Sequence, residues 1–312
     1  MTAPLGLVRI DKRNVSLTNT CSFDAACQVI AAALSDSYSY REALDSIPEI
    51  ANSIFGVAKD IATKGANKLA YRKRANILYN SFANEILAGG VHRVDCSCDC
   101  SNLMRKICTV PSVIEEVMCS SEYCANQFTE RRLSVLSVVF DRAADECFRR
   151  LSGYLEDGDI EDQHLCLMEL ELPSDKNDVS PNAFIYDADI SKKGPLCSGL
   201  TSRRARSGPH LFIEVIGSEE NLPGDGGDVG VMEVVKCCLK DVRTELVYKG
   251  NNYTLRGIVT FTPPARTTDI GHFQGYARRC DSTWEVYDDL RNKISIADPK
   301  SEINIHLVLY TI

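Results

Sequence analysis

Apolar positions recur at helical spacing in the first third of the chain. After Cys21 they return every three or four residues, which predicts an amphipathic helix beginning at this cysteine. Thr18 or Thr20 is placed to cap the N-terminus of that helix. We expect a short strand at 7–10 and mainly helical structure through residue 88, with helices at 40–45, 47–62 and 67–87.

The last third of the chain predicts a mainly antiparallel sheet. Short apolar runs alternate with turn residues, and Gly250-Asn251-Asn252 is a hairpin signal. The glycine-rich segment 217–230 is expected to be a flexible loop beside them. Helices first and strands last predict an α+β architecture in which the Cys21 helix packs on the sheet. The expected strands are 210–216, 231–239, 244–248, 253–261, 272–278, 284–287 and 303–311.

A cysteine-rich segment lies between these halves. Residues 96–100 place cysteines at alternate positions, where two of them can share one face of a strand, and a second pair flanks a turn. Short strands are expected at 107–114 and 133–140. Tetrahedral zinc takes four soft ligands at about 2.3 Å. The preferred zinc ligands are Cys98, Cys100, Cys119 and Cys124, with Cys96 as a substitute in the first pair and unligated thiols as the alternative to zinc.

Polar segments separate this region from the sheet. Residues 141–155 predict a short helix or the edge of a strand, and 156–162 predict an exposed acidic loop. Residues 173–208 are polar and rich in turn residues, which predicts a surface insert carrying an arginine cluster.

Composition narrows the class of protein. The 312 residues include 43 acidic and 35 basic side chains, which gives a net charge of −8. Nucleic-acid binding needs a basic surface, so this charge argues weakly against it. No run approaches the roughly 18 apolar residues of a membrane span, and residues 1–14 lack the apolar core of a secretory signal. The 14 cysteines therefore indicate a reducing compartment, in which metal binding or catalysis is expected before disulfides.

Cys21 is a candidate nucleophile because of its place at the start of a helix. The positive end of the helix dipole and the unpaired N–H groups favour its thiolate form. A buried structural cysteine is the alternative, since free cysteines are among the most buried residues. A catalytic role therefore requires a base and an orienting acid elsewhere in the chain.

His272 is the best candidate for that base. It stands at a junction between loop and strand, where Gly271 allows close approach of a substrate. Asp288 ends the next strand, and antiparallel pairing brings it beside His272, where it can orient the imidazole. Asp289 is expected to point the other way. The alternatives are an ordinary strand histidine and an acidic turn.

These segments resemble the ubiquitin-specific protease family. That family has a cysteine box, Gly-Asn-Thr-Cys-Tyr-x-Asn, and a histidine box, Gly-His-Tyr-x-x-Tyr, followed by a tryptophan and an aromatic-Asp-Asp. The chain carries the similar segments Asn19-Thr20-Cys21, Gly271-His272-Phe273-Gln274-Gly275-Tyr276 and Trp284-Glu285-Val286-Tyr287-Asp288-Asp289 in the same order. The final strand, at 305–310, is also similar, and the cysteine-rich segment lies where the family has zinc-binding fingers.

The resemblance implies a papain-like cysteine protease fold in one catalytic domain. Its parts would be a helical lobe over 1–90, a zinc-binding β-fingers insert over about 91–140, and a sheet over about 209–312. Cys21 would be the nucleophile, His272 the base and Asp288 the orienting acid of a deubiquitinase that hydrolyses isopeptide bonds at the C-terminus of ubiquitin. The implied cofactor is structural zinc, and the implied partners are ubiquitin and ubiquitinated proteins, without nucleic acid or membrane. The implied location is cytoplasmic or nuclear.

The cysteine box departs from the family pattern just around the nucleophile. The oxyanion donor therefore stays open between Ser16, the backbone N–H of Cys21 and a rotated Asn19. Alternative functions are a weak or inactive ubiquitin-binding module, a protease for SUMO or another ubiquitin-like modifier, and a zinc-dependent scaffold. Four positions differ: Ser16 replaces the oxyanion-hole Asn, Thr18 the Gly, Ser22 the Tyr and Asp24 the final Asn.

Overall fold

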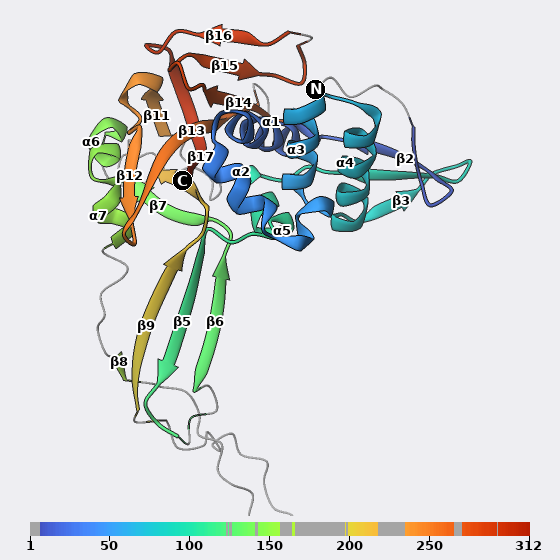
Figure 1. The fold of residues 1–312 in the computed structure, drawn as a ribbon. Helices are drawn as coiled ribbons and strands as arrows, with labels where there is room; N and C mark the ends of the chain where they lie inside the picture. The colour runs from blue at the N-terminus through green and yellow to red at the C-terminus, as the bar shows by residue number, and fades with distance from the viewer. Residues whose placement is uncertain are drawn as a thin grey trace, which may run out of the picture.

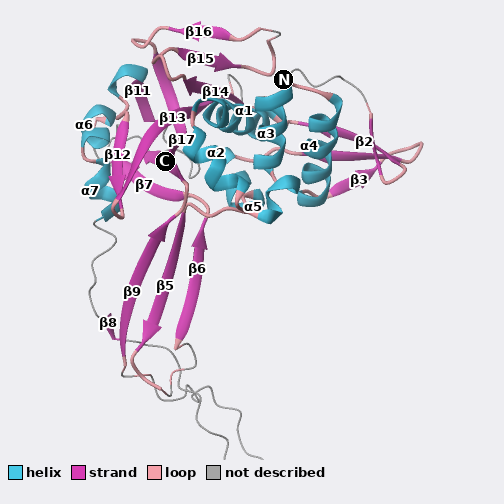
Figure 2. Cartoon of the chain, viewed as in Figure 1, coloured by secondary structure: helices cyan, strands magenta, loops and turns pink. Residues whose placement is uncertain are grey.

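The chain folds into a helical lobe beside a large sheet, with a long β projection leaving their junction (Figure 1). This is a computed structural model, and it describes residues 7–122, 124, 127–140, 143–156, 164–165, 197, 199–217, 235–264, 270–291 and 293–312. The mixture of helices and strands in Figure 2 confirms the α+β class. Among the helices of these ranges, none has the length and apolar character needed to cross a bilayer.

The helical lobe is built around α1, which is buried from Ser22 to Leu34. Its alanine-rich sequence allows close contact on every side, so neighbouring helices and the sheet surround it. The helices are α1 (Cys21–Asp36), α2 (Tyr38–Asp45), the 3-10 helix η1 (Pro48–Asn52), α3 (Ile54–Lys64) and α4 (Lys68–Ser81).

A small sheet borders this lobe in the order β1-β2-β4-β3, with β2 and β4 parallel. The helix expected over 67–87 ends at Ser81, and the following residues pair with β4 instead, because the tertiary pairing outweighs local helical spacing. Its strands are β1 (Val8–Ile10), β2 (Arg13–Thr18), β3 (Asn84–Ile86) and β4 (Val91–Asp95).

One helix of the lobe was not expected from the sequence. Helix α5 (Cys100–Ile107) begins after Asp99, whose carboxylate accepts a hydrogen bond from Asn102 N at 2.8 Å. Its buried face has helical spacing, at Cys100, Leu103, Met104 and Ile107. The alternating cysteines are therefore divided between a loop and a helix, and the strand geometry assumed for them does not apply.

The large sheet has nine strands and is covered on both faces. Phe212 and Leu309 pack in the core that contains α1, whereas their neighbours Leu211 and Val308 pack with Phe148 of α6. Alternate side chains thus enter two separate cores, which explains the continuous apolar runs. The covering helices on the second face are α6 (Ala144–Arg149) and α7 (Leu151–Glu156).

The central path of this sheet is β16-β15-β14-β13-β17-β10-β7, with β11 on β17 and β12 on β13. The strands expected at 272–278 and 284–287 agree with β14 and β15 to the residue. The strands are β7 (Leu136–Phe140), β10 (His210–Gly217), β11 (Val235–Cys238), β12 (Glu245–Tyr248), β13 (Asn251–Thr262), β14 (His272–Arg278), β15 (Trp284–Tyr287), β16 (Ser295–Ala297) and β17 (Glu302–Thr311).

The projection, here called the finger, is a sheet in the order β6-β5-β9-β8 (Figure 1). The surface insert expected over 173–208 is wrong from residue 200 onward, because this segment forms β9 and pairs with β5 along its length. Its polar composition is explained by ion pairs such as Arg206–Glu116, at 2.7 Å. The strands are β5 (Val113–Cys119), β6 (Phe128–Leu133), β8 (His164–Leu165) and β9 (Leu200–Ser207).

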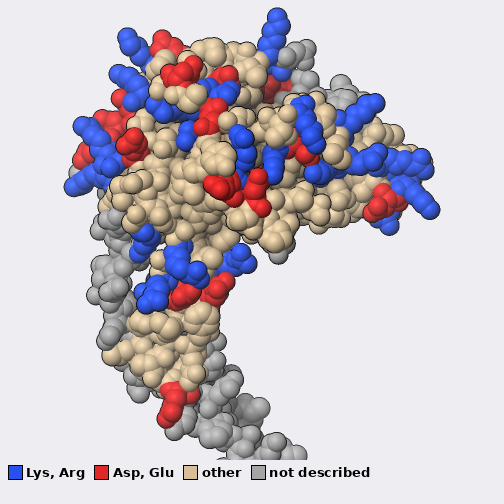
Figure 3. Space-filling view, in the orientation of Figure 1, with Lys and Arg blue, Asp and Glu red and all other residues tan. Residues whose placement is uncertain are grey.

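The insert expected over about 91–140 contains only part of this finger. Residues 91–95 form β4 of the small sheet, and α5 packs in the core around α1. The loop expected at 217–230 lies outside the described residues after Gly217. In the space-filling view, basic and acidic side chains are interspersed over the visible face, including the base of the finger (Figure 3).

Candidate functional site

The structure brings Cys21, His272 and Asp288 together from both ends of the chain. Cys21 is the first residue of α1, His272 is the first of β14, and Asp288 directly follows β15. Strands β14 and β15 are antiparallel, with Gly275 opposite Tyr287, so the start of one lies beside the end of the other. His272 Nε2 lies 2.9 Å from Asp288 Oδ1, and the imidazole is close enough to the Cys21 thiol for that thiol to be the largest influence on its pKa.

These contacts favour a charged imidazole. The hydrogen bond to Cys21 is the largest influence on His272; together with Asp288 and Asp289 it outweighs burial and raises the pKa of His272 from 6.5 to about 9. A protonated His272 beside Cys21 stabilises a thiolate, which is the nucleophilic form of cysteine.

The carboxylate of Asp288 is held from several directions. Leu290 N donates to Oδ1 at 3.0 Å, while Gln274 Nε2 donates to Oδ2 at 2.8 Å. Arg291 Nε lies 3.1 Å from Oδ2. Burial opposes the charged form, but hydrogen bonds from His272, Leu290 and Gln274 still lower the pKa of Asp288 below its usual value. Asp288 is therefore a fixed anion that orients His272.

The expectation that Asp289 points away from the site is wrong. Its Oδ1 lies 3.5 Å from His272 Nε2 and is buried. The strand alternation behind that expectation ends at Tyr287, because a turn begins with the hydrogen bond from Arg291 N to Asp288 O. Burial, followed by the charge of Asp24, raises the pKa of Asp289.

The first turn of α1 contains a buried polar network. Thr20 occupies the N-cap position, but its hydroxyl donates to Asp24 Oδ2 at 2.9 Å and does not cap the helix. Arg74 of α4 reaches the same Thr20 hydroxyl and forms an ion pair with Asp24 at 2.5 Å. The arginine thus balances the carboxylate that stands where the family has an asparagine.

The same region bears on the oxyanion donor. Asn19 has a positive φ of 55°, and its side-chain amide donates to Asp95 Oδ1 and Ser97 Oγ, both at 2.9 Å. The Asn19 amide therefore already donates to two side chains. The Thr20 side chain accepts no hydrogen bond from the first N–H groups of α1. Such groups at a helix N-terminus stabilise a developing negative charge. The contacts favour the backbone N–H of Cys21 over Asn19, and Ser16 is not among the described residues lining the cavity next to Cys21.

That cavity has a volume of about 290 Å³ and mainly apolar walls. One polar wall contains Asp99, whose Oδ1 lies 3.6 Å from His306 Nε2. Burial opposes ionisation, but hydrogen bonds from His306 and Asn102 keep the pKa of Asp99 below its usual value. The apolar walls come from Val215, Ile216, Phe261, Ile270, Phe273 and Ile305.

The structure separates the four cysteines predicted to bind zinc. Cys98 lines the cavity beside Cys21, and the buried Cys100 Sγ contacts Ser22 O at 3.6 Å. Cys119 and Cys124 lie instead with Cys197, their ligand atoms all within 4.8 Å of one another. The predicted pairing is therefore corrected: Cys98 and Cys100 belong to the helical lobe, and Cys197 joins the other two at the finger.

The cysteine cluster fits a soft metal ion. The Sγ atoms of Cys119 and Cys197 are 3.6 Å apart, close to the edge of about 3.8 Å expected for a tetrahedron with 2.3 Å bonds. Ser121 N and Gly199 N donate to these two sulfurs at 3.5 and 3.3 Å, which stabilises thiolates. A Cβ at Gly199 would lie 2.6 Å from Cys119 Sγ, so only glycine fits there. In the sequence, the cysteine-x-glycine spacing at Cys197 and Gly199 is the feature that could have indicated Cys197 as a third candidate ligand.

Comparisons with known proteins give distant similarities. No protein-family model matches the chain. A 120.7 kDa protein in the NOF-FB transposable element of Drosophila melanogaster is 22% identical over an alignment 323 residues long. The alignment covers 98% of this chain. The chain spans about a quarter of that relative, 26% of its length.

Solved structures of the SAGA DUB module, comprising Ubp8, Sgf11, Sus1 and Sgf73, are also similar. Those with ubiquitin aldehyde and with monoubiquitin are 13% and 11% identical, with TM-scores of 0.42 and 0.43. The matches cover 100% of this chain and 70% and 69% of those chains.

Proposed function

We propose that the chain is a thiol-dependent deubiquitinase with Cys21 as nucleophile, His272 as base and Asp288 as orienting acid. The observation that carries this proposal is the joining of Cys21, which lines one mainly apolar cavity, to His272 and Asp288, which follow it by more than 250 positions in the chain. A charged His272 next to a cysteine at a helix N-terminus is the arrangement expected of an activated thiol.

The proposed reaction has two stages. The Cys21 thiolate attacks the carbonyl carbon at the C-terminus of ubiquitin, and the C–N bond to the substrate lysine breaks as His272 gives its proton to the amine. Water then attacks the thioester; His272 accepts its proton, and the C–S bond breaks to release the carboxylate. The N–H groups at the start of α1 support the oxyanion in both stages.

The cavity suits the tail of the modifier. A narrow extended peptide can enter it, its apolar parts against residues such as Phe261 and Phe273, and its arginines near the carboxylate of Asp99. The supporting evidence is the combination of apolar walls with one fixed anion. A SUMO-type modifier is the alternative substrate.

We further propose that the finger binds zinc through Cys119, Cys124 and Cys197. Their spacing and the N–H···S contacts support thiolate ligands. Zinc supplies no chemistry to the reaction; it would hold the distal ends of β5 and β9 together. The finger would then contact the globular part of ubiquitin.

A ubiquitin-binding module with weak or no activity is the second candidate. The specific observation in its favour is that the Asn19 amide is engaged with Asp95 and Ser97, and so donates to no oxyanion. Loss of one such donor costs about 10²–10³ in rate.

Covalent capture by a ubiquitin carrying a C-terminal propargylamide tests the proposal. We expect an adduct with the wild-type protein, none with Cys21→Ala, and a retained adduct with Cys98→Ala, whose thiol lines the same cavity. Capture by a SUMO probe and not by the ubiquitin probe would show that the substrate is SUMO in place of ubiquitin. Binding of ubiquitin without capture by either probe would favour the binding module and refute the hydrolase.

A further inference from the structure

The nucleophile helix and the hairpin that carries the base meet at two widely separated points. Helix α1 has 16 residues and is about 24 Å long, with Cys21 first and Asp36 last. Strands β14 and β15 place His272 and Asp288 at their open end, whereas Arg279 begins the turn at the other end. One end of α1 therefore contacts the base, and the other contacts this turn.

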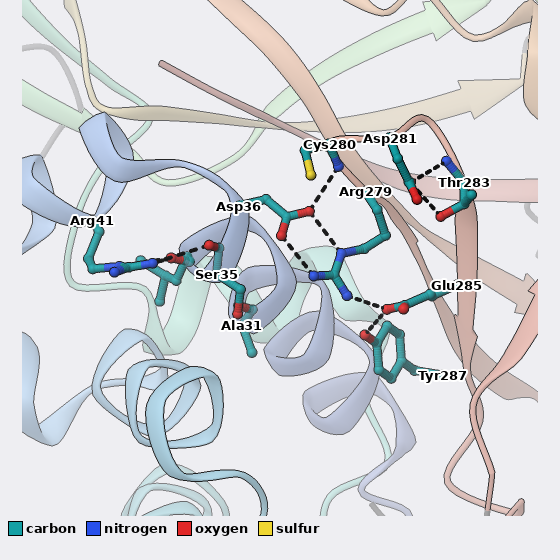
Figure 4. A network of polar contacts seen from close by, with 11 residues as sticks. Ala31, Ser35, Asp36, Arg41, Arg279, Cys280, Asp281, Thr283, Glu285 and Tyr287 are labelled. Carbon is teal, nitrogen blue, oxygen red and sulfur yellow. Dashed lines mark hydrogen bonds and ion pairs between the residues drawn. The ribbon is translucent and has the colours of Figure 1, made fainter.

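Arg279 binds the last residue of α1 through two parallel hydrogen bonds (Figure 4). Its Nε and Nη2 donate to Oδ2 and Oδ1 of Asp36, each at 2.8 Å, and Cys280 N donates to Oδ2 at 3.0 Å. The bond from Arg279 is the largest influence that lowers the pKa of Asp36, despite its burial. The planar guanidinium fixes direction as well as distance.

The same arginine reaches β15, the strand that precedes Asp288. Its Nη1 donates to Glu285 Oε2 at 2.7 Å, and Tyr287 OH donates to the same oxygen at 2.6 Å (Figure 4). Tyr287 directly precedes Asp288. Arg279 thus joins α1 to β15 as well as to its own turn.

The turn that holds Arg279 is itself braced. Asp281 Oδ1 accepts hydrogen bonds from Thr283 N and Oγ1, at 3.0 and 2.7 Å. Arg279 N also donates to Thr283 O at 2.9 Å. These contacts make the turn a fixed attachment point for the helix.

Between the two ends, α1 lies directly on the backbone of β14. A Cβ built at Gly275 would lie 2.8 Å from Ala25 O and 3.1 Å from Val29 Cγ2. No side chain at this strand position stands between strand and helix, and the polar contacts described between α1 and this hairpin lie at the two ends of the helix. A shift of α1 along its axis would change the distance between Cys21 and His272.

We propose that Arg279 is a positioning residue for the nucleophile. By holding Asp36 and Glu285 together, it sets the place of α1 along β14 and thereby keeps the Cys21 thiol against His272. The effect on turnover rests on the proposed function, but the effect on the Cys21–His272 contact does not.

The test compares Arg279→Met, Arg279→Lys and Asp36→Asn with the wild-type protein. Arg278→Ala is the matched control, since it removes the neighbouring charge, whose side chain contacts Ser282 Oγ at 2.9 Å. Alkylation of Cys21 by iodoacetamide is followed against pH by mass spectrometry of the Cys21 peptide. In parallel, kcat and KM are measured on ubiquitin–aminomethylcoumarin, and far-UV circular dichroism checks folding.

We expect Arg279→Met to lower kcat by about 10- to 100-fold, the effect of a displacement of about 1 Å, with KM little changed. The pH dependence of Cys21 alkylation should move in the same variant, because the thiolate loses its charged neighbour. Arg279→Lys and Asp36→Asn should give smaller losses, since each leaves part of the bidentate contact. The double variant Asp36→Asn/Arg279→Met should be no worse than Arg279→Met alone.

Wild-type kcat and an unchanged alkylation profile in all folded Arg279 and Asp36 variants would overturn the positioning role, even with a lower melting temperature. An equal change in Arg278→Ala would overturn it too. If the wild-type protein cleaves no ubiquitin substrate but the alkylation profile still shifts in Arg279→Lys and Asp36→Asn, the proposed function fails and the positioning role stands.

Discussion

The buried ion pair beneath Cys21 leads to a prediction about stability. Arg74 and Asp24 lie 2.5 Å apart, and their side chains are 4% and 3% exposed. Replacing Arg74 with Met keeps much of the side-chain volume but removes the charge. Among the described residues, the buried carboxylate of Asp24 then keeps the Thr20 hydroxyl as its side-chain donor.

Breaking a buried pair by removing one partner costs about 3–5 kcal/mol, because an uncompensated charge remains inside the protein. Asp24 Oδ1 and Arg74 Nε make no hydrogen bond among the described residues. Because these two atoms of the ion pair lack hydrogen bonds, we expect the loss of folding free energy to lie near the lower figure, about 3 kcal/mol. Removing both charges should restore most of this loss.

Urea unfolding followed by circular dichroism at pH 7 measures the effect. We expect Arg74→Met to lose about 3 kcal/mol and Arg74→Met/Asp24→Asn to lose clearly less. Arg72→Met, on the exposed face of the same helix, is the control and should change stability by less than about 0.5 kcal/mol. A double variant no more stable than Arg74→Met, or a single variant equal to Arg72→Met, would refute the reasoning.

The other predictions concern pH, metal and packing. The pKa of His272 is raised to about 9, so its contribution to stability is full below about pH 6.5 and is lost as the pH rises through about 9; activity should fall over the same alkaline range. Asp288→Asn removes one of the raising influences and should move this alkaline limb of the kcat/KM profile to lower pH; an unmoved limb would contradict the role of Asp288. Cys197→Ser should lower the zinc content measured by plasma mass spectrometry, whereas Cys98→Ser should leave it unchanged, and the reverse result would restore the original ligand set. Gly275→Val should reduce Cys21 capture by the ubiquitin probe, because a Cβ there would meet Ala25 O at 2.8 Å; full capture would show that α1 tolerates displacement.

Much of the sheet and the meeting of the candidate residues could be predicted from the sequence. Residues 272–278 and 284–287 are short, alternating and bounded by turn residues, so their strand ends were well marked. Antiparallel pairing then places His272 and Asp288 together without further information.

The errors share a physical cause, since each depends on contacts between residues far apart in sequence. The polar sequence of β9 predicts a surface insert because both faces of the finger carry polar side chains, and its partner β5 lies some 80 residues earlier. Cys197 was not predicted as a candidate zinc ligand for the same reason, because it lies close to Cys119 and Cys124 only in the folded chain. Asp289 was misplaced because the strand alternation stopped one residue before Asp288.

The buried network at α1 could not be predicted either. Asp24 departs from the family's cysteine box, while Arg74 ends the basic run Arg72-Lys73-Arg74, and charged side chains are mostly exposed. Only the packing of α4 against the first turn of α1 shows that the two compensate each other.

Hydrolysis of a ubiquitin-lysine isopeptide substrate tests the central claim most directly. Initial rates would be measured for the wild-type protein and for Cys21→Ala, His272→Ala and Cys98→Ala. The proposal predicts turnover by the wild-type protein and Cys98→Ala, and no enzyme-dependent turnover by Cys21→Ala or His272→Ala. Undiminished turnover by Cys21→Ala would contradict it, as would a folded wild-type protein that cleaves neither ubiquitin nor another ubiquitin-like modifier.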